Sequence, residues 1–420
     1  MSNAPEIRFK EFSKEWNTKS LEKFADVKQG FPFNSKTYDK KGIYNIVTIS
    51  NVGGDRYLRK INEANKIKKL PSGIQEHQIL KENNILVSMT GNVGRVSLNS
   101  GNNNLLNQRV DVIIPKDINN EFLFQTLSLS RFEKEMNISA QGAAQLNISN
   151  SDVEKYEISV PELPEQEKIG DFLLNLQKTI DFKKIKNEKI KNYKNEMLLK
   201  MFPNGSTTPE IRFKEFSKEW NNCIFGNVLS KLSNNSYSRD LLNYKEGKAK
   251  NIHYGDILIR YGFSIDVCRP EVPYINSDVD VNSIKRENYL ITGDVVFADT
   301  AEDETAGKAV EIINDNNNCV LSGLHTYPCR PNIKFYPGFL GICFNTKQFH
   351  NKLTKYMQGT KVTGFNYEYL SRLDFSYPEL PEQEKIVKFF DNLDSLILGL
   401  DKEINILLHL KESISSKMLV

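Results

Sequence analysis

The chain has 420 residues, too many for one ordinary hydrophobic core, so we expect two or more domains. Hydrophobic residues make up 39% and charged residues 26% of the sequence, as in a soluble globular protein, and the formal net charge of +3 means that any nucleic-acid site must come from local clustering of Lys and Arg. The sequence has no apolar stretch long enough to cross a bilayer and no Cys-x-x-Cys pair among its five cysteines, so we expect a cytoplasmic protein with no membrane partner, no disulfide framework and no metal site.

The chain opens on a segment that it repeats later. Residues 5–16 (PEIRFKEFSKEW) recur without change at 209–220, and residues 161–169 (PELPEQEKI) recur at 378–386. Between these shared blocks the two halves have little in common, as expected of segments that do different jobs. Each half is therefore predicted to contain a variable domain followed by a hinge and a long helix. The predicted parts are 1–160, 161–206, 207–377 and 378–420.

Both variable domains mix short apolar runs with glycine and asparagine turns. The segment 84–96 (NILVSMTGNVGRV) is an example. Such runs predict strands and hairpins, and we expect one helix over about 122–136 and its counterpart over about 339–357. Each domain should therefore be of mixed α/β type, and the whole chain of the α+β class.

Several loops of these domains are rich in Asn, Gln, Thr and Arg. Arg suits the guanine edge and Asn or Gln the adenine edge in the major groove of DNA, whereas lysines can hold phosphates. The alternative is that these loops are merely solvated turns, and that a histidine among them is packed or solvated. The candidate DNA-binding residues are Asn34, Lys36, Asn51, Thr90, Asn92, Arg95, Asn107, Gln108, Arg109, Gln141, Gln145, Arg260, Tyr261, Thr300, Lys308, His325, Gln358 and Lys361.

After each LPEQE sequence the pattern becomes helical. Pro164 and Pro381 suit the first helical position, and the glutamates that follow suit the positive end of the helix dipole. Apolar residues then alternate four and three residues apart, which predicts a heptad seam with polar members in the middle of the first helix. The seam positions are Ile169, Leu173, Leu176, Ile180, Lys183, Asn187, Ile190, Lys194, Met197 and Met201 in the first helix and Ile386, Phe390, Leu393, Ile397, Leu400, Ile404, Leu407, Lys411, Ile414 and Met418 in the second.

The repeat also predicts how these helices pair. If a pseudo-twofold axis relates the halves, the helices must run antiparallel, with Lys183 opposite Ile404 and Asn187 opposite Leu400. We therefore predict an antiparallel coiled coil whose polar seam residues lower its stability and fix its register. The alternative is two separate amphipathic helices, each packed on its own domain.

The order of domain, LPEQE helix, domain and LPEQE helix resembles the specificity subunits of type I restriction-modification systems over almost the whole chain. The motifs that carry the resemblance are the shared blocks, GFPF at 30–33, TGNVGR at 90–95 and NQR at 107–109. One departure is Asn83-Asn84, which stands where Gly-Asp is common. Another is the segment 359–362, which matches the loop at Gly142 only loosely.

The resemblance implies that each domain is a target-recognition domain that reads one half of an asymmetric bipartite site in double-stranded DNA. It implies that the paired helices set the length of the unread spacer and dock two adenine-N6 methyltransferase subunits, to which nuclease and translocase subunits are added. Those partners would bind S-adenosylmethionine and ATP, and this chain would need no cofactor. The candidate docking residues are Glu165, Gln166, Glu167, Lys168, Glu382, Gln383, Glu384 and Lys385.

Motifs that would give the chain a catalytic activity of its own are absent from the sequence. It has no Asn or Asp-Pro-Pro-aromatic motif for a target amine, no phosphate loop and neither a Gly-x-Ser-x-Gly nor a His-Glu-x-x-His motif. We therefore expect no catalytic residues. The alternatives are a coiled-coil scaffold, which would not require two divergent domains, and a DNA-binding protein that acts outside a restriction complex.

Overall fold

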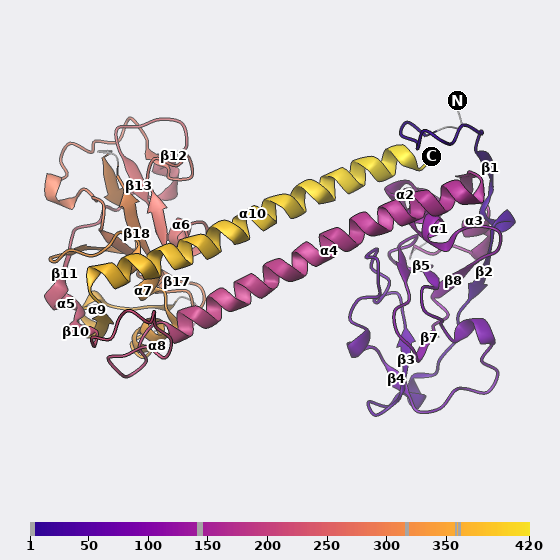
Figure 1. Cartoon of the computed structure of the whole chain (residues 1–420), viewed down its shortest axis with the longest axis horizontal. Coiled ribbons are helices and arrows are strands. Elements are labelled where there is room, and N and C mark those ends of the chain that lie inside the picture. The colour runs from indigo at the N-terminus through magenta and orange to yellow at the C-terminus, as the bar shows by residue number, and fades with distance from the viewer. Residues whose placement is uncertain (1–4, 141–145, 316–318, 358, 360–362) are drawn as a thin grey trace. The chain divides into compact units, whose positions relative to one another are not determined.

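The computed structural model describes residues 5–140, 146–315, 319–357, 359 and 363–420. Contacts divide the chain into two compact units, one made of Met1–Ile185 and Lys402–Val420 and the other of Lys186–Asp401. Each unit contains one mixed domain and a stretch of each of the two long helices, α4 (Leu163–Lys200) and α10 (Leu380–Met418) (Figure 1). Among the described helices, none is both long and apolar enough to span a membrane.

The domain of the first unit is built on a four-stranded antiparallel sheet in the order β2-β8-β5-β6. A three-stranded sheet has the order β4-β3-β7, with β3 and β7 parallel, and β1 pairs with β9. The strands are β1 (Asn17–Ser20), β2 (Ala25–Gln29), β3 (Tyr44–Val47), β4 (Lys66–Ile67), β5 (Ile85–Ser88), β6 (Val96–Leu98), β7 (Asn104–Leu106), β8 (Val110–Pro115) and β9 (Glu157–Val160). The helices are α1 (Asn120–Leu127), α2 (Ser130–Ser139) and α3 (Asn150–Glu154), with short 3-10 turns at Leu21–Lys23, Ser35–Thr37, Ile61–Glu63 and Glu76–Gln78.

The core of this domain lies on both faces of the four-stranded sheet. All four residues of β5 are buried, and its three apolar side chains alternate between two clusters, as the pleat of a strand requires. Ile85 and Val87 join the side chains of the helices, among them Phe122, whereas Leu86 joins side chains of β3 and β7. The repeated opening segment contributes Trp16 to the helix side, where its ring meets Phe122 edge-on.

The domain of the second unit follows the same plan. Its main sheet has the order β11-β20-β16-β18-β14, a second sheet has the order β12-β15-β13-β19, and β10 pairs with β22 and β17 with β21. The strands are β10 (Asn221–Ile224), β11 (Leu229–Lys231), β12 (Leu242–Asn243), β13 (Lys250–Ile252), β14 (Ser264–Asp266), β15 (Tyr274–Ile275), β16 (Val295–Ala298), β17 (Thr300–Ala301), β18 (Ala309–Asn314), β19 (Val320–Ser322), β20 (Thr326–Pro331), β21 (Thr363–Gly364) and β22 (Asp374–Tyr377). The helices are α5 (Phe225–Val228), α6 (Tyr254–Ile259), α7 (Phe339–Phe344), α8 (Lys347–Thr354) and α9 (Tyr367–Arg372), with 3-10 turns at Arg239–Leu241 and Arg286–Asn288.

The turn before the central strand, β5 or β16, is alike in the two domains. Asn83 has a φ of +63° and Gly293 a φ of +96°, both in the left-handed region. The side chain of Asn84 then accepts a hydrogen bond of 2.6 Å from the Lys81 amide, as Asp294 accepts one of 2.8 Å from an amide three residues before it. Asn83-Asn84 therefore forms the Gly-Asp type of turn, because asparagine tolerates positive φ and its side-chain carbonyl can replace a carboxylate oxygen.

The prediction of a single helix over about 122–136 is wrong in one respect, because this segment forms two helices, α1 and α2. The Ser128 hydroxyl donates a hydrogen bond of 2.7 Å to the Phe124 carbonyl, and Leu129 is extended. The predicted counterpart is likewise split into α7 and α8, where Asn345 donates 2.7 Å hydrogen bonds to the carbonyls of Ala309 and Gly341. Both breaks leave the apolar side chains on the core side, so the helical periodicity continues across them.

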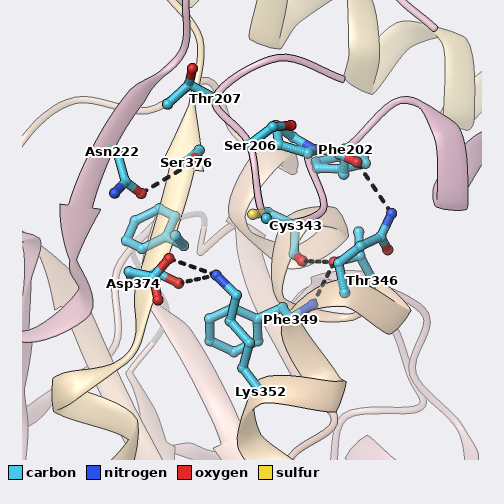
Figure 2. Close-up of a pocket in the computed structure, with 14 residues that line it drawn as sticks. Phe202, Ser206, Thr207, Asn222, Cys343, Thr346, Phe349, Lys352, Asp374 and Ser376 are labelled. Carbon is cyan, nitrogen blue, oxygen red and sulfur yellow. Dashed lines mark hydrogen bonds and ion pairs between the residues drawn. The ribbon is translucent and has the colours of Figure 1, made fainter. Parts of the chain in front are cut away.

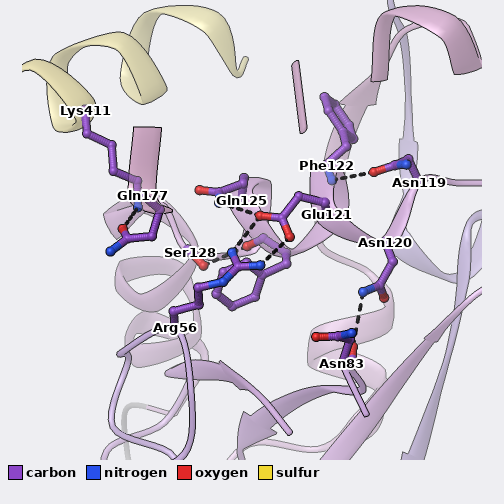
Figure 3. A network of polar contacts seen from close by, with 11 residues as sticks. Arg56, Asn83, Asn119, Asn120, Glu121, Phe122, Gln125, Ser128, Gln177 and Lys411 are labelled. Atoms are coloured by element: carbon purple, nitrogen blue, oxygen red, sulfur yellow. Dashed lines mark hydrogen bonds and ion pairs between the residues drawn. The ribbon is translucent and has the colours of Figure 1, made fainter. Parts of the chain in front are cut away.

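The long helices contact each other within the first unit. Lys411 of α10 donates a hydrogen bond of 2.7 Å to Gln177 of α4 (Figure 3), and Lys183 of α4 forms an ion pair of 2.7 Å with Glu403 of α10. As the residue number rises along α4, the number of the partner residue on α10 falls. The two helices therefore run antiparallel. The prediction of an antiparallel pair is confirmed, and the alternative of two separate helices is wrong.

The second unit continues this pairing. Asn187 donates a hydrogen bond of 2.6 Å to Asp401, and Lys194 lies 2.5 Å from Asp394. The predicted seam is confirmed, since every position of both series is buried or half-buried while most positions between them are exposed. Lys183 and Asn187 were predicted to lie opposite Ile404 and Leu400. Their polar side chains instead bond to the carboxylates one residue away, Glu403 and Asp401.

Candidate nucleic-acid interface

In the first domain, backbone hydrogen bonds bring several loops to one edge of the two sheets. The Gln108 amide donates to the Phe31 carbonyl after β2 at 3.0 Å, and the Asn107 amide donates to the last carbonyl of β3 at 3.1 Å. The Met89 amide, just after β5, donates to the Arg109 carbonyl at 3.1 Å. We call this surface the first edge and define it as residues 30–36, 48–51, 89–95 and 107–109.

Gly30 permits the closest of these approaches. A Cβ atom at this position would lie 2.2 Å from the carbonyl oxygen of Asn107, so a side chain would force the two loops apart. The Asn107 side chain accepts a hydrogen bond of 3.2 Å from the Arg109 amide, which holds the turn that presents Arg109. The motifs at 30–33 and 107–109 therefore pack directly against each other.

Arg56 anchors the loop that follows β3. Its guanidinium donates to both carboxylate oxygens of Glu121 on α1, each at 2.7 Å (Figure 3). It also lies 5.3 Å from the ring centres of Tyr57 and Phe124, a cation–π geometry that helps to fix the side chain. The loop is thus held to helix α1 by a half-buried ion pair. Sequence reasoning missed Arg56, because its partner lies 65 residues away.

Asn51 holds the same loop from within. Its side chain accepts a hydrogen bond from the Thr48 amide at 3.0 Å and donates one to the Arg59 carbonyl at 2.9 Å. Only 4% of Asn51 is exposed. The prediction that Asn51 contacts DNA is therefore wrong, because both ends of its amide are used inside the protein.

The other predicted residues of the first edge differ in how freely they can reach a partner. Gln108 and Arg109 are exposed, and so is Asn92 on the loop after β5. Thr90 is half-buried and donates a hydrogen bond of 3.2 Å to Asn147. Three further candidates are Asn34, which is exposed and caps a 3-10 turn, Lys36, which is exposed, and Arg95, which lies 3.0 Å from Glu133.

In the second domain, an equivalent set of hydrogen bonds forms a second edge. The Gly323 amide donates to the last carbonyl of β13 at 2.9 Å, and the Asn235 amide donates to the last carbonyl of β19 at 2.8 Å. The Asp299 amide, just after β16, donates to the His325 carbonyl at 3.1 Å, as Met89 does to Arg109 in the first domain. We define the second edge as residues 233–236, 253–256, 299–301 and 323–325.

The ladders of the two main sheets establish which positions correspond. Ser88 pairs with Val110 at the end of β5, and Ala298 pairs with Thr326 at the end of β16. Arg109 immediately precedes Val110, and His325 immediately precedes Thr326. Arg109 and His325 therefore occupy equivalent positions in the two domains.

The remaining predicted residues of the second domain have separate outcomes. His325 is exposed and Thr300 is half-buried, with its hydroxyl donating to the Thr363 carbonyl at 3.2 Å. Lys308 donates to the Leu258 carbonyl at 3.0 Å, and burial lowers the pKa of its amine. Arg260 is exposed at the end of α6, 3.4 Å from Asp256. Tyr261 is only 4% exposed and packs in the core, so its prediction as a DNA contact is wrong.

Four predicted residues, Gln141, Gln145, Gln358 and Lys361, lie outside the described residues. Sequence reasoning also missed Asp299 and Tyr254, which adjoin His325. A signal for Asp299 was present in the sequence. The offset that aligns Asn83-Asn84 with Gly293-Asp294 also aligns Met89 with Asp299.

The hinge blocks have a largely internal role. Arg8 donates to both carboxylate oxygens of Glu165 at 2.7 Å, and Gln166 accepts from the Asn119 amide and donates to the Pro161 carbonyl, both at 2.8 Å. The second unit repeats this arrangement with Arg212, Glu382 and Gln383.

These contacts change the predicted docking set. Four of the predicted docking residues are at most 2% exposed and present no surface to a partner, so their prediction as docking contacts is wrong. They are Glu165, Gln166, Glu382 and Gln383. The remaining four are Glu167, Lys168, Glu384 and Lys385, of which the lysines pair with Glu11 and Glu215.

A separate concavity of about 440 Å³ lies in the second unit, at the end of α4 (Figure 2). Lys352 donates to the carboxylate of Asp374 at 2.7 Å and to its carbonyl at 2.9 Å, so the two charges compensate each other. Gln348 donates to the Phe202 carbonyl at 3.2 Å. We interpret this concavity as the junction between the end of α4 and the domain. In the described part of the chain, no group of three or more His, Cys, Asp or Glu side chains could hold a metal ion.

The chain contains two unlike α+β domains, and each has a polar loop edge. Each domain is followed by one helix of an antiparallel pair. This arrangement is that of a two-domain recognition protein with paired long helices. The family model described as the type I restriction modification DNA specificity domain matches residues 13–192 and 239–409. The chain belongs to this family. Membership favours the specificity-subunit interpretation over the scaffold alternative.

Known relatives share parts or all of the fold. A Methanocaldococcus jannaschii protein, provisionally described as the type I restriction enzyme MjaX specificity subunit, is 30% identical over 146 residues. That match covers 33% of this chain and 34% of the relative, so about a third of the relative's length is aligned. The crystal structure of a type I restriction-modification S subunit from M. genitalium has a TM-score of 0.55 at 14% identity and covers 99% of both chains. A chain from a study of complex assembly and conformational transition of the type I R-M system has a TM-score of 0.55 at 15% identity, over 96% of this chain and 97% of that one.

Proposed function

We propose that this chain is the non-catalytic DNA specificity subunit of a type I restriction-modification or DNA-methyltransferase complex, in which each domain reads one half of a bipartite site. The observation that carries the proposal is the pair of equivalent edges with unlike side chains. The first edge presents Gln108 and Arg109 where the second presents Leu324 and His325. Because side-chain type decides which base edge can be hydrogen-bonded, the two half-sites should differ and the whole site should be asymmetric.

The partners would supply the chemistry. Two adenine-N6 methyltransferase subunits would bind S-adenosylmethionine, and nuclease and translocase subunits would bind ATP, all in the cytoplasm. This division of labour is supported by the absence from the sequence of motifs for a target amine or a nucleotide phosphate. This chain would contribute double-stranded DNA recognition, with exposed lysines such as Lys36 on phosphates.

The paired helices offer a surface for the methyltransferase subunits. In the first unit, Phe182 and Ile185 of α4 are 68% and 57% exposed, and Ile406 and Leu410 of α10 are 65% and 45% exposed. The two residues of each pair are three or four positions apart and so share one face of their helix, and contiguous exposed apolar side chains of this kind mark interaction sites. We assign the methyltransferase subunits to these helices, with Glu167, Lys168, Glu384 and Lys385 as polar contacts at the hinge ends.

The decisive experiment exchanges one domain. The full chain is assembled with its methyltransferase subunits, and modified bases are mapped by sequencing on genomic DNA. Replacing residues 18–160 by the corresponding segment of another family member should change one half of the methylated motif and leave the other half intact. An unchanged motif would contradict recognition by this domain.

Two further measurements accompany that exchange. The chain alone, with S-adenosylmethionine, should transfer no methyl group to DNA, and methylation by the chain alone would contradict the non-catalytic role. Affinity of the complex for DNA should fall steeply with salt concentration, because phosphate contacts release counterions.

A further inference from the structure

His325 of the second edge occupies the point at which the first edge presents Arg109, but its surroundings differ. In the first domain the residue whose amide binds the Arg109 carbonyl is Met89, which is buried and apolar. In the second domain the equivalent residue is Asp299, whose side chain carries a carboxylate. The second edge therefore combines a titratable ring with an acid that the first edge lacks at this point.

The imidazole of His325 has one side toward the protein and one side toward solvent. Its Nδ1 atom lies 3.4 Å from Oδ1 of Asp299, and the side chains of His325 and Asp299 are 50% and 18% exposed. The ring of Tyr254 meets the imidazole edge-on, with centroids 5.5 Å apart. Because the two ring nitrogens lie on opposite sides of the imidazole, contact at Nδ1 leaves Nε2 for a ligand at the edge.

The carboxylate is placed for this contact. Asp299 Oδ1 is buried and has no well-formed hydrogen bond with any of the described residues, and the His325 imidazole, which is charged only when protonated, lies 3.4 Å from it. Burial raises the pKa of the Asp299 carboxyl, and the nearby imidazole opposes that rise. His325 itself has a φ of +56°, a left-handed conformation that few side chains adopt readily. The structure thus holds a histidine in an uncommon conformation with its Nδ1 atom beside a largely buried carboxylate.

We propose, on the basis of the function proposed above, that His325 is a base-reading residue whose hydrogen-bonding role changes with its protonation, and that Asp299 is its positioning residue. When the ring is neutral with its proton on Nδ1, Nε2 accepts a hydrogen bond and can read adenine N6 or cytosine N4. When the ring is protonated, Nε2 donates and can read guanine O6 or N7. Arg109 remains a donor under all ordinary conditions, since its guanidinium does not lose its charge.

Other ionisable groups near this pair are His253, Arg239 and Lys231. The His253 ring packs on Tyr254 at 4.8 Å, and burial followed by the charge of Arg239 lowers the pKa of His253. Arg239 is itself held by Asp256 through hydrogen bonds of 2.7 and 2.6 Å. Lys231 also acts on the Asp299 carboxyl, and its ammonium lies over the rings of Tyr327 and Tyr367. Asp299 is therefore the acid in contact with the His325 ring, and these other groups are engaged with further partners.

The test uses the full chain assembled with its methyltransferase subunits. Genomic DNA is methylated at about pH 6 and about pH 8, within which range a histidine ordinarily titrates, and preferences at every motif position are read by sequencing. For the unmodified chain, one position of the second half-site should change its base preference by roughly tenfold between the two pH values. The first half-site should keep its preference.

Two variants separate base reading from mere structure. His325→Asn keeps a residue that adopts positive φ but cannot titrate, so the pH-dependent change should vanish. Asp299→Asn keeps His325 and the shape of its neighbour but removes the carboxylate that orients the imidazole, so the base preference at this position should weaken at both pH values while its pH dependence remains. This second variant decides the matter even if His325→Asn melts early in a circular dichroism scan.

A matched control lies in the first domain. Arg109→Gln should alter one position of the first half-site to the same extent at both pH values. If the second half-site has one pH-independent preference in the unmodified chain and in both variants, the inference is overturned while the bipartite motif still supports the proposed function. If no bipartite motif is methylated by any form of the complex, the proposed function fails as well.

Discussion

Arg8 donates hydrogen bonds to both carboxylate oxygens of Glu165, each at 2.7 Å, and the Glu165 side chain is fully buried. The two residues belong to the opening segment and the hinge block, which are the two parts of the sequence that recur without change. Arg212 and Glu382 form the same pair in the second unit. The shared blocks are therefore complementary halves of one structural element, which explains why both are retained while the domains between them differ.

The first prediction concerns the stability that this pair provides. Arg8→Met should destabilise the first unit by about 3 to 5 kcal/mol, because it leaves a buried carboxylate without its partner. A Trp220→Phe background leaves Trp16 as the fluorescent reporter of the first unit during chemical denaturation. Lys14→Ala is the control, because the ion pair of Lys14 with Glu162 is exposed and should contribute less than about 1 kcal/mol. Equal effects of the two substitutions would contradict the prediction.

The second prediction concerns Asp111, a buried acid on β8. It is 1% exposed, and neither carboxylate oxygen has a hydrogen-bond partner among the described residues. Burial, followed by the charge of Glu154, raises its pKa to about 7 from an ordinary 3.8. The folded state therefore binds the proton more tightly than the unfolded state, so stability is greatest below the ordinary pKa and falls as the pH rises toward 7.

Asp111→Asn removes the buried carboxyl whose ionisation destabilises the folded state. The variant should be more stable than the unmodified chain at about pH 8, by up to roughly 4 kcal/mol, and should differ little at about pH 4. Thermal melting over this pH range measures the difference. Asp152→Asn is the control with the opposite sign, because hydrogen bonds from Ser149 lower the pKa of Asp152, so its replacement should destabilise at neutral pH. A pH-independent effect of Asp111→Asn would refute the assignment.

The third prediction concerns the polar members of the helix seam. Asn187 is 3% exposed, and its Oδ1 atom is buried with no partner in the described structure. Lys183→Leu with Asn187→Leu should raise the melting temperature, because buried leucines replace polar groups whose desolvation is incompletely compensated. The register of the pair should become less specific. Asn195→Leu, at an exposed position of the same helix, should change the melting temperature little, and an unchanged or lower value for the double variant would argue against the seam.

Local signals in the sequence predicted the long helices well. Proline at the second residue of α4 and α10 and the heptad spacing both act over a few residues, so they are visible without knowledge of the fold. The breaks after α1 and α7 were not predicted. Their apolar spacing continues through the break, and one break depends on contacts of Asn345 with a strand 36 residues away.

Burial of polar residues could not be predicted in the same way. Glu165 and Gln166 look like an exposed polar hinge in the sequence, but their partners Arg8 and Asn119 lie 157 and 47 residues away. Tyr261 follows an exposed Arg260 and was assigned the same role, although its ring packs in the core. Which polar residues face solvent is decided by long-range packing, whereas the residue types at the edge loops are already present in the motifs.

The fourth prediction concerns the paired helices as the determinant of the spacer. Inserting four residues in α4, near Ile185, with a matching insertion in α10 near Lys402, should lengthen the accepted spacer while leaving both half-sites unchanged. Four helical residues add about 6 Å, close to two base-pair steps of about 3.4 Å. Modified-base mapping with the assembled complex measures the spacer directly. The same insertion in α4 alone should lower the melting temperature, because it shifts one helix against the seam of the other. A complex with both insertions that keeps the original spacer would show that the helices do not set it, whereas loss of both half-sites would mean that the insertions disturb the domains.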